Sequence, residues 1–332
     1  MPSLKAYNTF GVDVSAPAID YITSRKDLEQ LSFQAVNEYF ILGGGSNLLL
    51  TKDMDVPVLK NEIKGKRIVQ QSVGETWVQI GGGENWHETV LWTLEEKLSG
   101  LENLSLIPGT VGAAPIQNIG AYGVELKDVF YQLTAYDLIE KELVTFNKED
   151  CTFGYRSSFF KEPRNKGRYF ITHVTLKLSK SFSSVNTSYG AIKKVIDEKV
   201  GGAPNAKDVS EAVIEIRRSK LPDPAEIGNS GSFFKNPVVD RKILEDIQKN
   251  YVDVPFYEQE GGKVKIPAGW LIEQCGFKGK KYGETGSYAK QALIIVNYGN
   301  ATGSEIHNHA LRVQEEVKKV FNIGLECEVN IL

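Results

Sequence analysis

The sequence has little of what a metalloprotein or a disulfide-bonded secreted protein needs. It holds three cysteines and four histidines in 332 residues. Cys151, Cys275 and Cys327 lie far apart, with no Cys-x-x-Cys pair and no histidine at metal-ligand spacing. His307 and His309 are two residues apart on a predicted helix and cannot share a face, which argues against a zinc pair, and we expect both to be solvated. We therefore expect no structural metal, and the odd cysteine count is typical of a reducing cytoplasm.

An excess of charge and long apolar runs are also lacking. The chain has 39 Lys and Arg against 42 Asp and Glu, for a formal net charge of -3, and the basic residues are scattered. Such scatter predicts no broad basic face for nucleic acid, although local cations can still bind a phosphate-bearing small molecule. No stretch approaches the roughly 18 apolar residues that span a membrane, and the start lacks the apolar core of a signal peptide. We expect a cytoplasmic protein.

Glycine, in contrast, is abundant, and its 31 residues gather in blocks between apolar runs. Gly43-Gly44-Gly45-Ser46-Asn47 separates two short apolar runs, which predicts a strand, a turn and a second strand. No helix signal follows at once. This argues against a Rossmann unit, whose glycine loop opens a helix. A second block, residues 105–126, is dense in small residues and almost free of charge.

Helix and strand patterns alternate along the rest of the chain, and its length predicts two or three domains. Asn85 is a candidate cap for a helix with Trp86, Val90, Leu91, Leu94 and Leu98 at helical spacing, which we expect to pack on a sheet. Alternating runs over 129–178 predict antiparallel or mixed strands. Further helices are predicted over 190–200, 209–218 and from 304, with a strand over 325–332. The last helix should bury Ile306, Ala310, Val313, Val317 and Val320. Pro222 and Pro224 mark a domain boundary.

Two segments have the composition of phosphate-binding loops. Residues 108–123 offer many backbone N–H groups that no large side chain shields, and residues 43–47 offer a second set. Either segment alone is equally well explained as a glycine-rich turn. Together they favour a dinucleotide ligand.

Ser232 is the most interesting hydroxyl in the sequence. In Gly228-Asn-Ser-Gly-Ser-Phe-Phe-Lys-Asn-Pro237 it lies beside Lys235 and Asn236. A nucleophilic serine usually sits in Gly-x-Ser-x-Gly with a histidine partner, and this pattern has neither, which disfavours hydrolysis. By pattern alone Ser232 is more often a turn or cap residue, and Arg156 and Glu328 are more often surface ion-pair residues than catalytic ones.

Taken together, these blocks resemble the UDP-N-acetylenolpyruvoylglucosamine reductase family nearly from end to end. The markers, in chain order, are Asn8-Thr-Phe-Gly11, Ile41-Leu-Gly-Gly-Gly-Ser-Asn47, Ile107-Pro-Gly-Thr-Val-Gly112 with Gln117-Asn-Ile-Gly-Ala-Tyr-Gly123, Tyr155-Arg-Ser-Ser-Phe-Phe-Lys161, Gly231-Ser-Phe-Phe-Lys-Asn-Pro237, Ala268-Gly-Trp-Leu-Ile-Glu-Gln-Cys275 and Glu326-Cys-Glu-Val329.

The resemblance implies an α+β fold: a two-subdomain FAD-binding fold of the vanillyl-alcohol-oxidase type plus an α+β substrate-binding domain. The implied FAD-binding subdomains cover residues 1–65 and 66–208. The substrate-binding domain covers 209–320, and residues 321–332 form a C-terminal strand that returns to the flavin site. A monomer is expected.

The resemblance also assigns the site residues. Arg156, Ser232 and Glu328 match the catalytic positions, and Tyr189 matches the tyrosine that the longer form of the family folds over the substrate. The cofactor FAD is implied to contact Gly43, Gly44, Gly45, Ser46, Asn47, Pro108, Gly109, Thr110, Gly112, Gln117, Asn118, Gly120 and Gly123. The nucleotide sugar is implied to contact Tyr189, Arg217, Lys220, Asn236 and Gln291.

The implied reaction is the NADPH-dependent reduction of UDP-N-acetylglucosamine enolpyruvate to UDP-N-acetylmuramate, a step of peptidoglycan synthesis and so of cell-wall biogenesis, cell shape and division. Hydride addition to the enolpyruvyl double bond leaves an enediolate, which Arg156 and Glu328 would stabilise. Ser232 would then donate a proton, helped by a cation such as Lys235.

The sequence departs from the family at two places, because Cys327 stands where proline is frequent and Asn330 where arginine is frequent. Two other interpretations remain open at this stage. The chain could be a flavin oxidase or dehydrogenase on the same fold, or a non-catalytic nucleotide-binding protein.

Overall fold

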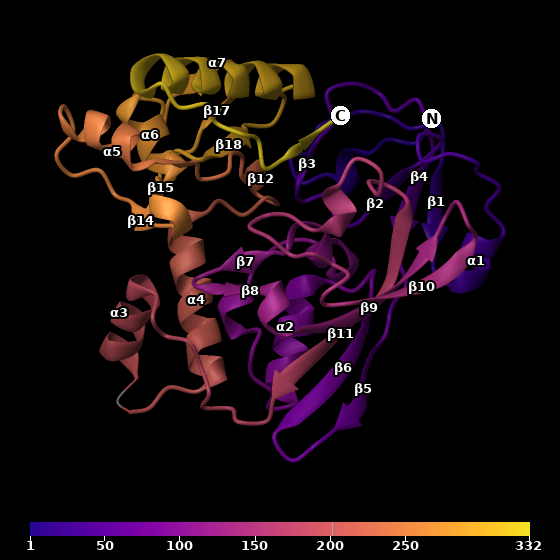
Figure 1. Ribbon diagram of the computed structural model, residues 1–332. Helices are drawn as coiled ribbons and strands as arrows, with labels where there is room; N and C mark the ends of the chain where they lie inside the picture. Colours follow the sequence, from indigo (N-terminus) through magenta and orange to yellow (C-terminus); the bar gives the residue numbers. More distant parts are fainter. Residues whose placement is uncertain (201) are drawn as a thin grey trace. The chain divides into compact units, whose positions relative to one another are not determined.

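The computed structural model describes residues 1–200 and 202–332 (Figure 1). These residues form two compact units. Unit 1 comprises residues 1–2, 16–45 and 54–219. Unit 2 comprises residues 3–15, 46–53 and 220–332. The chain therefore passes between the units several times, and each unit is built from segments distant in sequence.

Unit 1 contains a three-stranded parallel sheet in the order β1-β4-β2, with β1 at Ile19–Ile22, β4 at Val58–Asn61 and β2 at Phe40–Leu42. Helix α1 (Arg25–Glu29) is preceded by its N-cap residue Ser24, which forms a capping box with Asp27. The fully buried Leu28 of α1 and Leu59 of β4 share one apolar cluster. The predicted strand before the glycine turn is thus β2.

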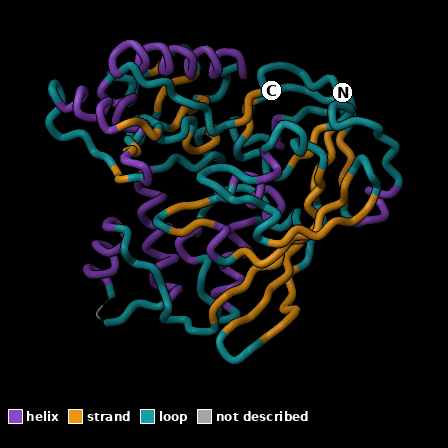
Figure 2. Tube along the Cα trace, viewed as in Figure 1, coloured by secondary structure: helices purple, strands orange, loops and turns teal. Residues whose placement is uncertain are grey.

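The larger sheet of unit 1 is antiparallel, in the order β10-β9-β11-β6-β5, as labelled in Figure 1. Its long strands are drawn in orange in Figure 2. Its strands are β5 (Lys66–Gln71), β6 (Glu75–Gly81), β9 (Phe130–Asp137), β10 (Glu142–Asn147) and β11 (Tyr169–Ser179). The antiparallel strands predicted over 129–178 are therefore confirmed. Strand β11 lies at the centre and is mostly buried, whereas the edge strand β5 is mostly exposed.

Helix α2 (Trp86–Glu95) packs on this sheet, as predicted. The Asn85 side chain accepts a hydrogen bond from Glu88 N at 3.0 Å, which confirms the predicted cap. Trp86 and Val90 join the core formed by Val78 and Leu176. The helix ends before Leu98, and Leu91 is 39% exposed, so the predicted apolar face is too wide.

The segment after α2 is a series of short turns. It contains 3-10 helices η2 (Glu102–Leu104), η3 (Val111–Gln117) and η4 (Leu126–Asp128), the two-residue strands β7 (Gly120–Ala121) and β8 (Val124–Glu125), and, after β10, η5 (Phe159–Lys161). Helices α3 (Gly190–Lys199) and α4 (Ala206–Lys220) follow and share a core of Ile192, Ile196, Val209 and Val213. Both predicted helices exist, and α4 starts three residues earlier than expected.

Unit 2 contains a four-stranded sheet in the order β12-β18-β17-β16. Its strands are β12 (Gly228–Ser232), β16 (Lys281–Tyr282), β17 (Thr285–Ser287) and β18 (Ile294–Asn297). A second sheet in the order β13-β15-β14 consists of Val238–Asp240, Lys263–Lys265 and Tyr257–Glu258, near α5 (Arg241–Gln248), η6 (Glu260–Gly262) and α6 (Ala268–Gln274). The N-terminal segment of unit 2 contains η1 (Lys5–Tyr7).

Helix α7 (Gly303–Phe321) packs against β17 and β18 (Figure 1). Thr302 and Glu305 form a capping box at its start, and Asn322 ends it in the left-handed conformation. The predicted apolar face is buried except for Val320, which is 42% exposed; Phe321 is buried instead. Within the described part of the chain, no helix is long and apolar enough to cross a membrane.

Candidate active site

The predicted FAD-binding glycines bring two loops of unit 1 into direct backbone contact. A Cβ on Gly44 would lie 2.7 Å from the Cα of Gly109, and a Cβ on Gly43 would lie 2.7 Å from Thr110 Oγ1. Any larger residue at either position would push the loops apart. Glycine is therefore required here by close approach, while Gly45 is required by its left-handed backbone at φ 64°.

Backbone hydrogen bonds with residues 82–86 hold the start of the loop over residues 108–123. Trp86 N donates to Gly109 O at 3.0 Å, Val111 N donates to Glu84 O at 2.9 Å, and Gly112 N donates to Gly82 O at 2.8 Å. The Val111 and Gly112 amides are thus used within the protein. The loop therefore offers fewer free N–H groups to a ligand than the sequence analysis predicts.

The Thr110 hydroxyl and the bare backbone of Gly43 fit an acceptor-rich group such as the pyrophosphate of FAD. Thr110 Oγ1 is buried and has no hydrogen-bond partner among the described residues. An orphaned hydroxyl of this kind is costly unless a ligand satisfies it. It lies beside the bare backbone of Gly43, so the site combines a donor with a surface that a ligand can approach closely.

Asn118 organises the turn between η3 and β7. It is fully buried and adopts φ 46°, a left-handed conformation that asparagine tolerates. Its Nδ2 donates to Glu125 Oε2 at 3.0 Å and to Gly154 O at 3.1 Å, and its Oδ1 accepts from Lys127 N at 3.0 Å. One side chain therefore fixes three backbone or side-chain groups around Gly120.

Arg156 lies on a left-handed turn next to that same segment. Gly154 and Ser157 exchange two backbone hydrogen bonds, at 3.0 and 3.3 Å, so that Tyr155 and Arg156 form the tip of a tight turn. Arg156 has φ 52°, which is strained for a residue other than glycine. Its Nη1 would lie 3.3 Å from a Cβ on Gly120, so the guanidinium crosses the bare face of that glycine.

A cluster of aromatic and basic side chains gathers around Arg217 of α4. Burial lowers the pKa of Arg217, and the charge of Arg156 adds to the decrease, while the Tyr122 hydroxyl opposes it through charge and hydrogen bonding. Tyr122 in turn packs edge-on against Tyr189, with ring centroids 5.2 Å apart. Arg217 Nε is buried without a partner among the described residues, so the cluster has unused capacity to bind an acceptor.

Tyr122 and His87 are members of this neighbourhood that the sequence did not single out. His87 Nδ1 accepts a hydrogen bond from Leu106 N at 3.0 Å. Leu106 has a left-handed backbone, with φ 57°. The pKa of His87 is lowered by burial and further by Arg218 and Arg217, which favours the neutral ring that this bond needs. Tyr122 could have been found from its place in the Gln117–Gly123 marker.

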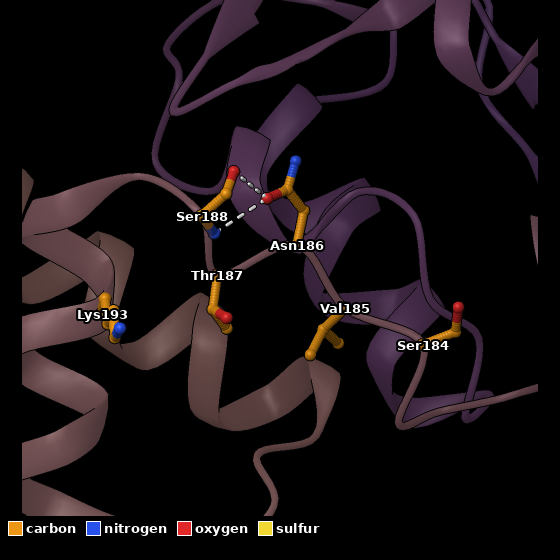
Figure 3. A pocket seen from close by; sticks show the side chains of 6 residues that line it. All are labelled: Ser184, Val185, Asn186, Thr187, Ser188 and Lys193. Carbon is orange, nitrogen blue, oxygen red and sulfur yellow. Dashed lines mark hydrogen bonds between the residues drawn. The ribbon is translucent and has the colours of Figure 1, made fainter.

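Next to Tyr189, the segment of residues 184–188 lines a polar pocket together with Lys193 (Figure 3). The Asn186 Oδ1 accepts from Ser188 N at 3.0 Å and from Ser188 Oγ at 2.6 Å, as the dashed lines in Figure 3 show. No predicted FAD-binding residue lines this pocket. The residues that line the pocket are adjacent in sequence to Tyr189, the residue directly before α3.

In unit 2, backbone pairing brings Ser232 and Glu328 together. Glu328 N donates to Phe233 O at 2.9 Å, and Lys235 N donates to Glu326 O at 2.9 Å, around an antiparallel bridge between Phe234 and Cys327. Ser232 ends β12 and is exposed, whereas Phe233 and Phe234 are buried and anchor the segment. The serine hydroxyl and the carboxylate thus belong to neighbouring residues of two paired segments.

Lys235 does not stand alone beside Ser232. Its Nζ lies 2.5 Å from Glu326 Oε1, and its side chain is only 19% exposed. The cation is therefore largely balanced by a carboxylate. Any effect of Lys235 on the serine hydroxyl is reduced accordingly.

The predicted flavin residues Ser46 and Asn47 belong to unit 2, where the C-terminal strand holds them. Asn47 Nδ2 donates to Glu328 O at 3.2 Å. Asn47 O accepts from Asn330 N at 3.2 Å and from Asn330 Nδ2 at 3.0 Å. Strand β19 (Asn330–Ile331) pairs in parallel with β3 (Leu48–Leu49), so only two residues of the predicted strand 325–332 are in a strand.

Two predicted substrate residues meet at the start of α6. Asn236 Oδ1 accepts from Ala268 N at 2.9 Å, and Gln291 Oε1 lies 2.7 Å from where a Cβ of Gly269 would be. Gln291 Oε1 also accepts from Leu293 N at 3.3 Å. Lys220 ends α4 and is exposed. Both amide oxygens are engaged with the protein, which leaves their N–H groups as the donors available to a ligand.

Among the residues the structure describes, no group of three or more His, Cys, Asp or Glu side chains could hold a metal ion. His309 instead donates to or accepts from Ser287 Oγ at 3.1 Å, deep in the core between α7 and β17. Contrary to expectation it is fully buried and not solvated.

Two family models match the chain. One is described as the C-terminal domain of UDP-N-acetylenolpyruvoylglucosamine reductase and matches residues 223–332. The other is described as an FAD binding domain and matches residues 28–142. The first covers the Ser232 and Glu328 segments, and the second covers both glycine loops.

The chain is similar over nearly its whole length to bacterial proteins that are named UDP-N-acetylenolpyruvoylglucosamine reductase. A UDP-N-acetylenolpyruvoylglucosamine reductase of Flavobacterium johnsoniae is 49% identical over 331 residues, 99% of this chain and 98% of the relative. One of Pseudomonas aeruginosa is 46% identical over 332 residues, 99% of this chain and 97% of the relative.

Among solved structures, the UDP-N-acetylenolpyruvylglucosamine reductase of Thermus caldophilus resembles this fold with a TM-score of 0.68. It is 24% identical, and the match covers 99% of this chain and 96% of that one. With the two family models, this likeness confirms the predicted α+β architecture, with an FAD-binding fold of the vanillyl-alcohol-oxidase type followed by a substrate-binding domain.

Proposed function

Because this chain belongs to the UDP-N-acetylenolpyruvoylglucosamine reductase family, we propose that it reduces UDP-N-acetylglucosamine enolpyruvate to UDP-N-acetylmuramate with electrons from NADPH. The reaction is a step in peptidoglycan precursor synthesis. The observation that carries the proposal is the backbone pairing of the segments that contain Ser232 and Glu328 within unit 2, where Glu328 N donates to Phe233 O.

The cofactor is FAD, which when bound would supply the hydride-transfer chemistry between NADPH and the enolpyruvyl group. In unit 1, Gly43, Gly44, Gly109 and Thr110 would hold it through close backbone approach and the Thr110 hydroxyl. The other proposed contacts are Gly45, Ser46, Asn47, Pro108, Gly112, Gln117, Asn118, Gly120 and Gly123.

Arg156 and Glu328 would stabilise the negative charge that hydride addition drives onto the substrate carboxylate. A guanidinium is a permanent cation whose planar fork matches a carboxylate, and the left-handed turn beside Gly120 restricts where it can point. Glu328 would donate a hydrogen bond to the same group in its protonated form.

Ser232 would complete the reaction by protonating the adjacent carbon. The carbon–carbon double bond is then fully saturated, because hydride has bonded to one carbon and the Ser232 proton to the other. An enediolate is a strong base, so even a weakly acidic hydroxyl can protonate it. The alkoxide left on Ser232, which is exposed, would recover a proton from solvent.

The nucleotide sugar would be held by Tyr189, Arg217, Lys220, Asn236 and Gln291. Support comes from Arg217, whose buried Nε has no protein partner in the described chain, and from the amides of Asn236 and Gln291 at the start of α6. A diphosphate would supply the acceptors that a buried guanidinium needs.

The remaining assignments are also proposals. Residues 1–65 and 66–208 would form the FAD-binding subdomains, 209–320 the substrate-binding domain, and 321–332 the strand that returns to the flavin site. The protein would act in the cytoplasm, and as a monomer, because one chain supplies every proposed catalytic residue. Sedimentation at working concentration tests the monomer.

An anaerobic titration tests the function. The purified protein should show flavin absorbance, lose it on addition of NADPH, and recover it when UDP-N-acetylglucosamine enolpyruvate is added. A colourless protein would support a nucleotide-binding role instead. Faster recovery with dioxygen than with the enolpyruvyl sugar would indicate an oxidase on the same fold.

A further inference from the structure

A buried amide, Asn103 of η2, joins two loops of unit 1. It is 1% exposed, and its Nδ2 donates to Tyr122 O at 3.1 Å and to Asn186 O at 2.9 Å. The first carbonyl belongs to the loop that follows η3, and the second belongs to the segment that leads into Tyr189. These segments are distant in sequence, and a single side chain connects them.

The connection continues from Asn186 to Tyr189. The Asn186 Oδ1 accepts from both the amide and the hydroxyl of Ser188, at 3.0 and 2.6 Å (Figure 3). Its Nδ2 donates to Gly123 O at 3.4 Å. The Tyr189 ring then contacts the Tyr122 ring edge-on at 5.2 Å. An unbroken series of contacts therefore runs from Asn103 to Tyr189.

Tyr189 depends on such support, because it is 41% exposed and the residues on either side of it, Ser188 and Gly190, are exposed as well. Asn103, in contrast, is poorly suited to stabilising the fold alone. Its Oδ1 is buried without a partner in the described part of the chain, a cost that an apolar side chain would avoid.

We infer that Asn103 is a positioning residue that holds Tyr189 in place for contact with the enolpyruvyl sugar. The inference rests on the proposed function, since it requires Tyr189 to contact that substrate. Asn103 itself touches neither substrate nor cofactor in this assignment. It acts through the two carbonyls to which it donates.

The test measures flavin reduction by NADPH and reoxidation by the enolpyruvyl sugar separately in the Asn103→Ala protein. The KM for UDP-N-acetylglucosamine enolpyruvate should rise about tenfold or more, as expected when a binding group is displaced. The rate of flavin reduction by NADPH should stay within about twofold of wild type, because Tyr189 has no part in it. Equal losses in both half-reactions, or an unchanged KM, would overturn the inference.

A double-mutant cycle with Tyr189→Ala distinguishes positioning from general loosening. If Asn103 acts through Tyr189, Asn103→Ala should add less than about twofold to the KM of the Tyr189→Ala protein. Additive effects, or a Tyr189→Ala protein with normal KM, contradict the inference. A wild-type protein that the sugar fails to reoxidise would instead refute the proposed function, and the inference with it.

Two further variants guard against a folding artefact. Asn297→Ala is the matched control, since Asn297 is buried and its Nδ2 also donates to two carbonyls, Phe10 O at 2.9 Å and Ala301 O at 3.4 Å. It should leave the KM for the sugar unchanged. Asn186→Ala removes a half-buried side chain and should raise that KM by a smaller factor; an unchanged KM there would count against the inference.

Discussion

The two units present their proposed catalytic groups in different ways. In unit 1, Arg156 lies on a left-handed turn near Gly120, and buried side chains such as Asn118 fix the surrounding loops. In unit 2, Ser232 and Glu328 lie on extended segments that pair through their backbones. Loops fixed by side chains can be displaced by one substitution, whereas backbone pairing survives most side-chain changes.

The comparison is tested most strongly at Ser232. Ser232→Ala leaves the backbone pairing intact, so the protein should fold, bind FAD and be reduced by NADPH. Without the proton donor, reoxidation by the enolpyruvyl sugar should slow by about 10³-fold, within the range of general acid catalysis. Anaerobic stopped-flow absorbance measures both steps.

Ser230→Ala is the matched control, because Ser230 is two residues away on β12 and its hydroxyl donates to Leu48 O at 3.2 Å. It should reoxidise at close to the wild-type rate. Normal turnover in Ser232→Ala would remove that residue from the mechanism.

Arg156→Lys tests the group on the left-handed turn. Both residues bear the same backbone strain at φ 52°, so the change isolates the head group. Reoxidation should slow by about 10²-fold, because an ammonium lacks the planar fork that matches a carboxylate. The rate constant for reoxidation at saturating sugar is the quantity to measure.

Arg168→Lys provides the comparison, since Arg168, directly before β11, pairs through Nη2 with Oδ2 of Asp137 at the end of β9, at 2.6 Å. It should lower the melting temperature and leave reoxidation unchanged. A similar rate loss in both variants would show that the fork of Arg156 has no special role.

Much of the fold and of the candidate site was predicted from the sequence. The predictions that failed concern contacts between residues distant in sequence. Patterns with a strong local signal were predicted correctly: the Asn85 cap, the alternating strands and the last helix, predicted from 304 and observed as α7. The glycine loops were recognised by composition, but no composition reveals that the Val111 and Gly112 amides are already bonded to Glu84 and Gly82.

Long-range side-chain contacts were the other gap. Tyr122, Asn103 and His87 act through partners distant in sequence, and His309 was expected to be solvated because a single buried histidine leaves no periodic signal. The pairing of Ser232 with Glu328 joins residues almost a hundred positions apart along the chain. Only the family resemblance linked them in advance.

Asn118→Ala should show how much the loops of unit 1 depend on one side chain. The change leaves Gly154 O and Lys127 N without their partners and places alanine at φ 46°. Together these effects should cost about 3–4 kcal/mol of unfolding free energy. Urea unfolding and flavin content measure the effect, and a loss below about 1 kcal/mol would break the contrast between the units.

His309 is a buried polar side chain that anchors part of unit 2. Burial lowers its pKa from 6.5 to about 4, and Arg312 adds to the decrease. Ser287 bonds to Nε2, Phe277 and Tyr282 contact the ring, and Nδ1 has no partner among the described residues. Because the unfolded chain binds the proton more tightly, the contribution of neutral His309 to stability is fully present above about pH 6.5 and is lost as the pH drops toward 4.

The loss should be at most about 3 kcal/mol, measured by urea unfolding at pH 7 and at pH 4.5. His309→Gln should flatten this part of the pH profile, since glutamine does not titrate. His307→Gln, on the same helix, should leave the profile as it is. An equally steep profile in His309→Gln would assign the acid sensitivity to other groups.

The smallest effect is expected at Asn330, which stands where the family frequently has arginine. Its Nδ2 donates to Asn47 O, but its own backbone N–H donates to the same oxygen, and β19 remains paired with β3. Asn330→Ala should therefore cost less than about 1 kcal/mol, with flavin content unchanged. Asn118→Ala serves as the comparison, because it also removes an amide that contacts backbone, and the two unfolding curves should differ in midpoint. If Asn330→Ala proved as damaging as Asn118→Ala, the C-terminal strand would depend on its side chains as much as the loops of unit 1 do.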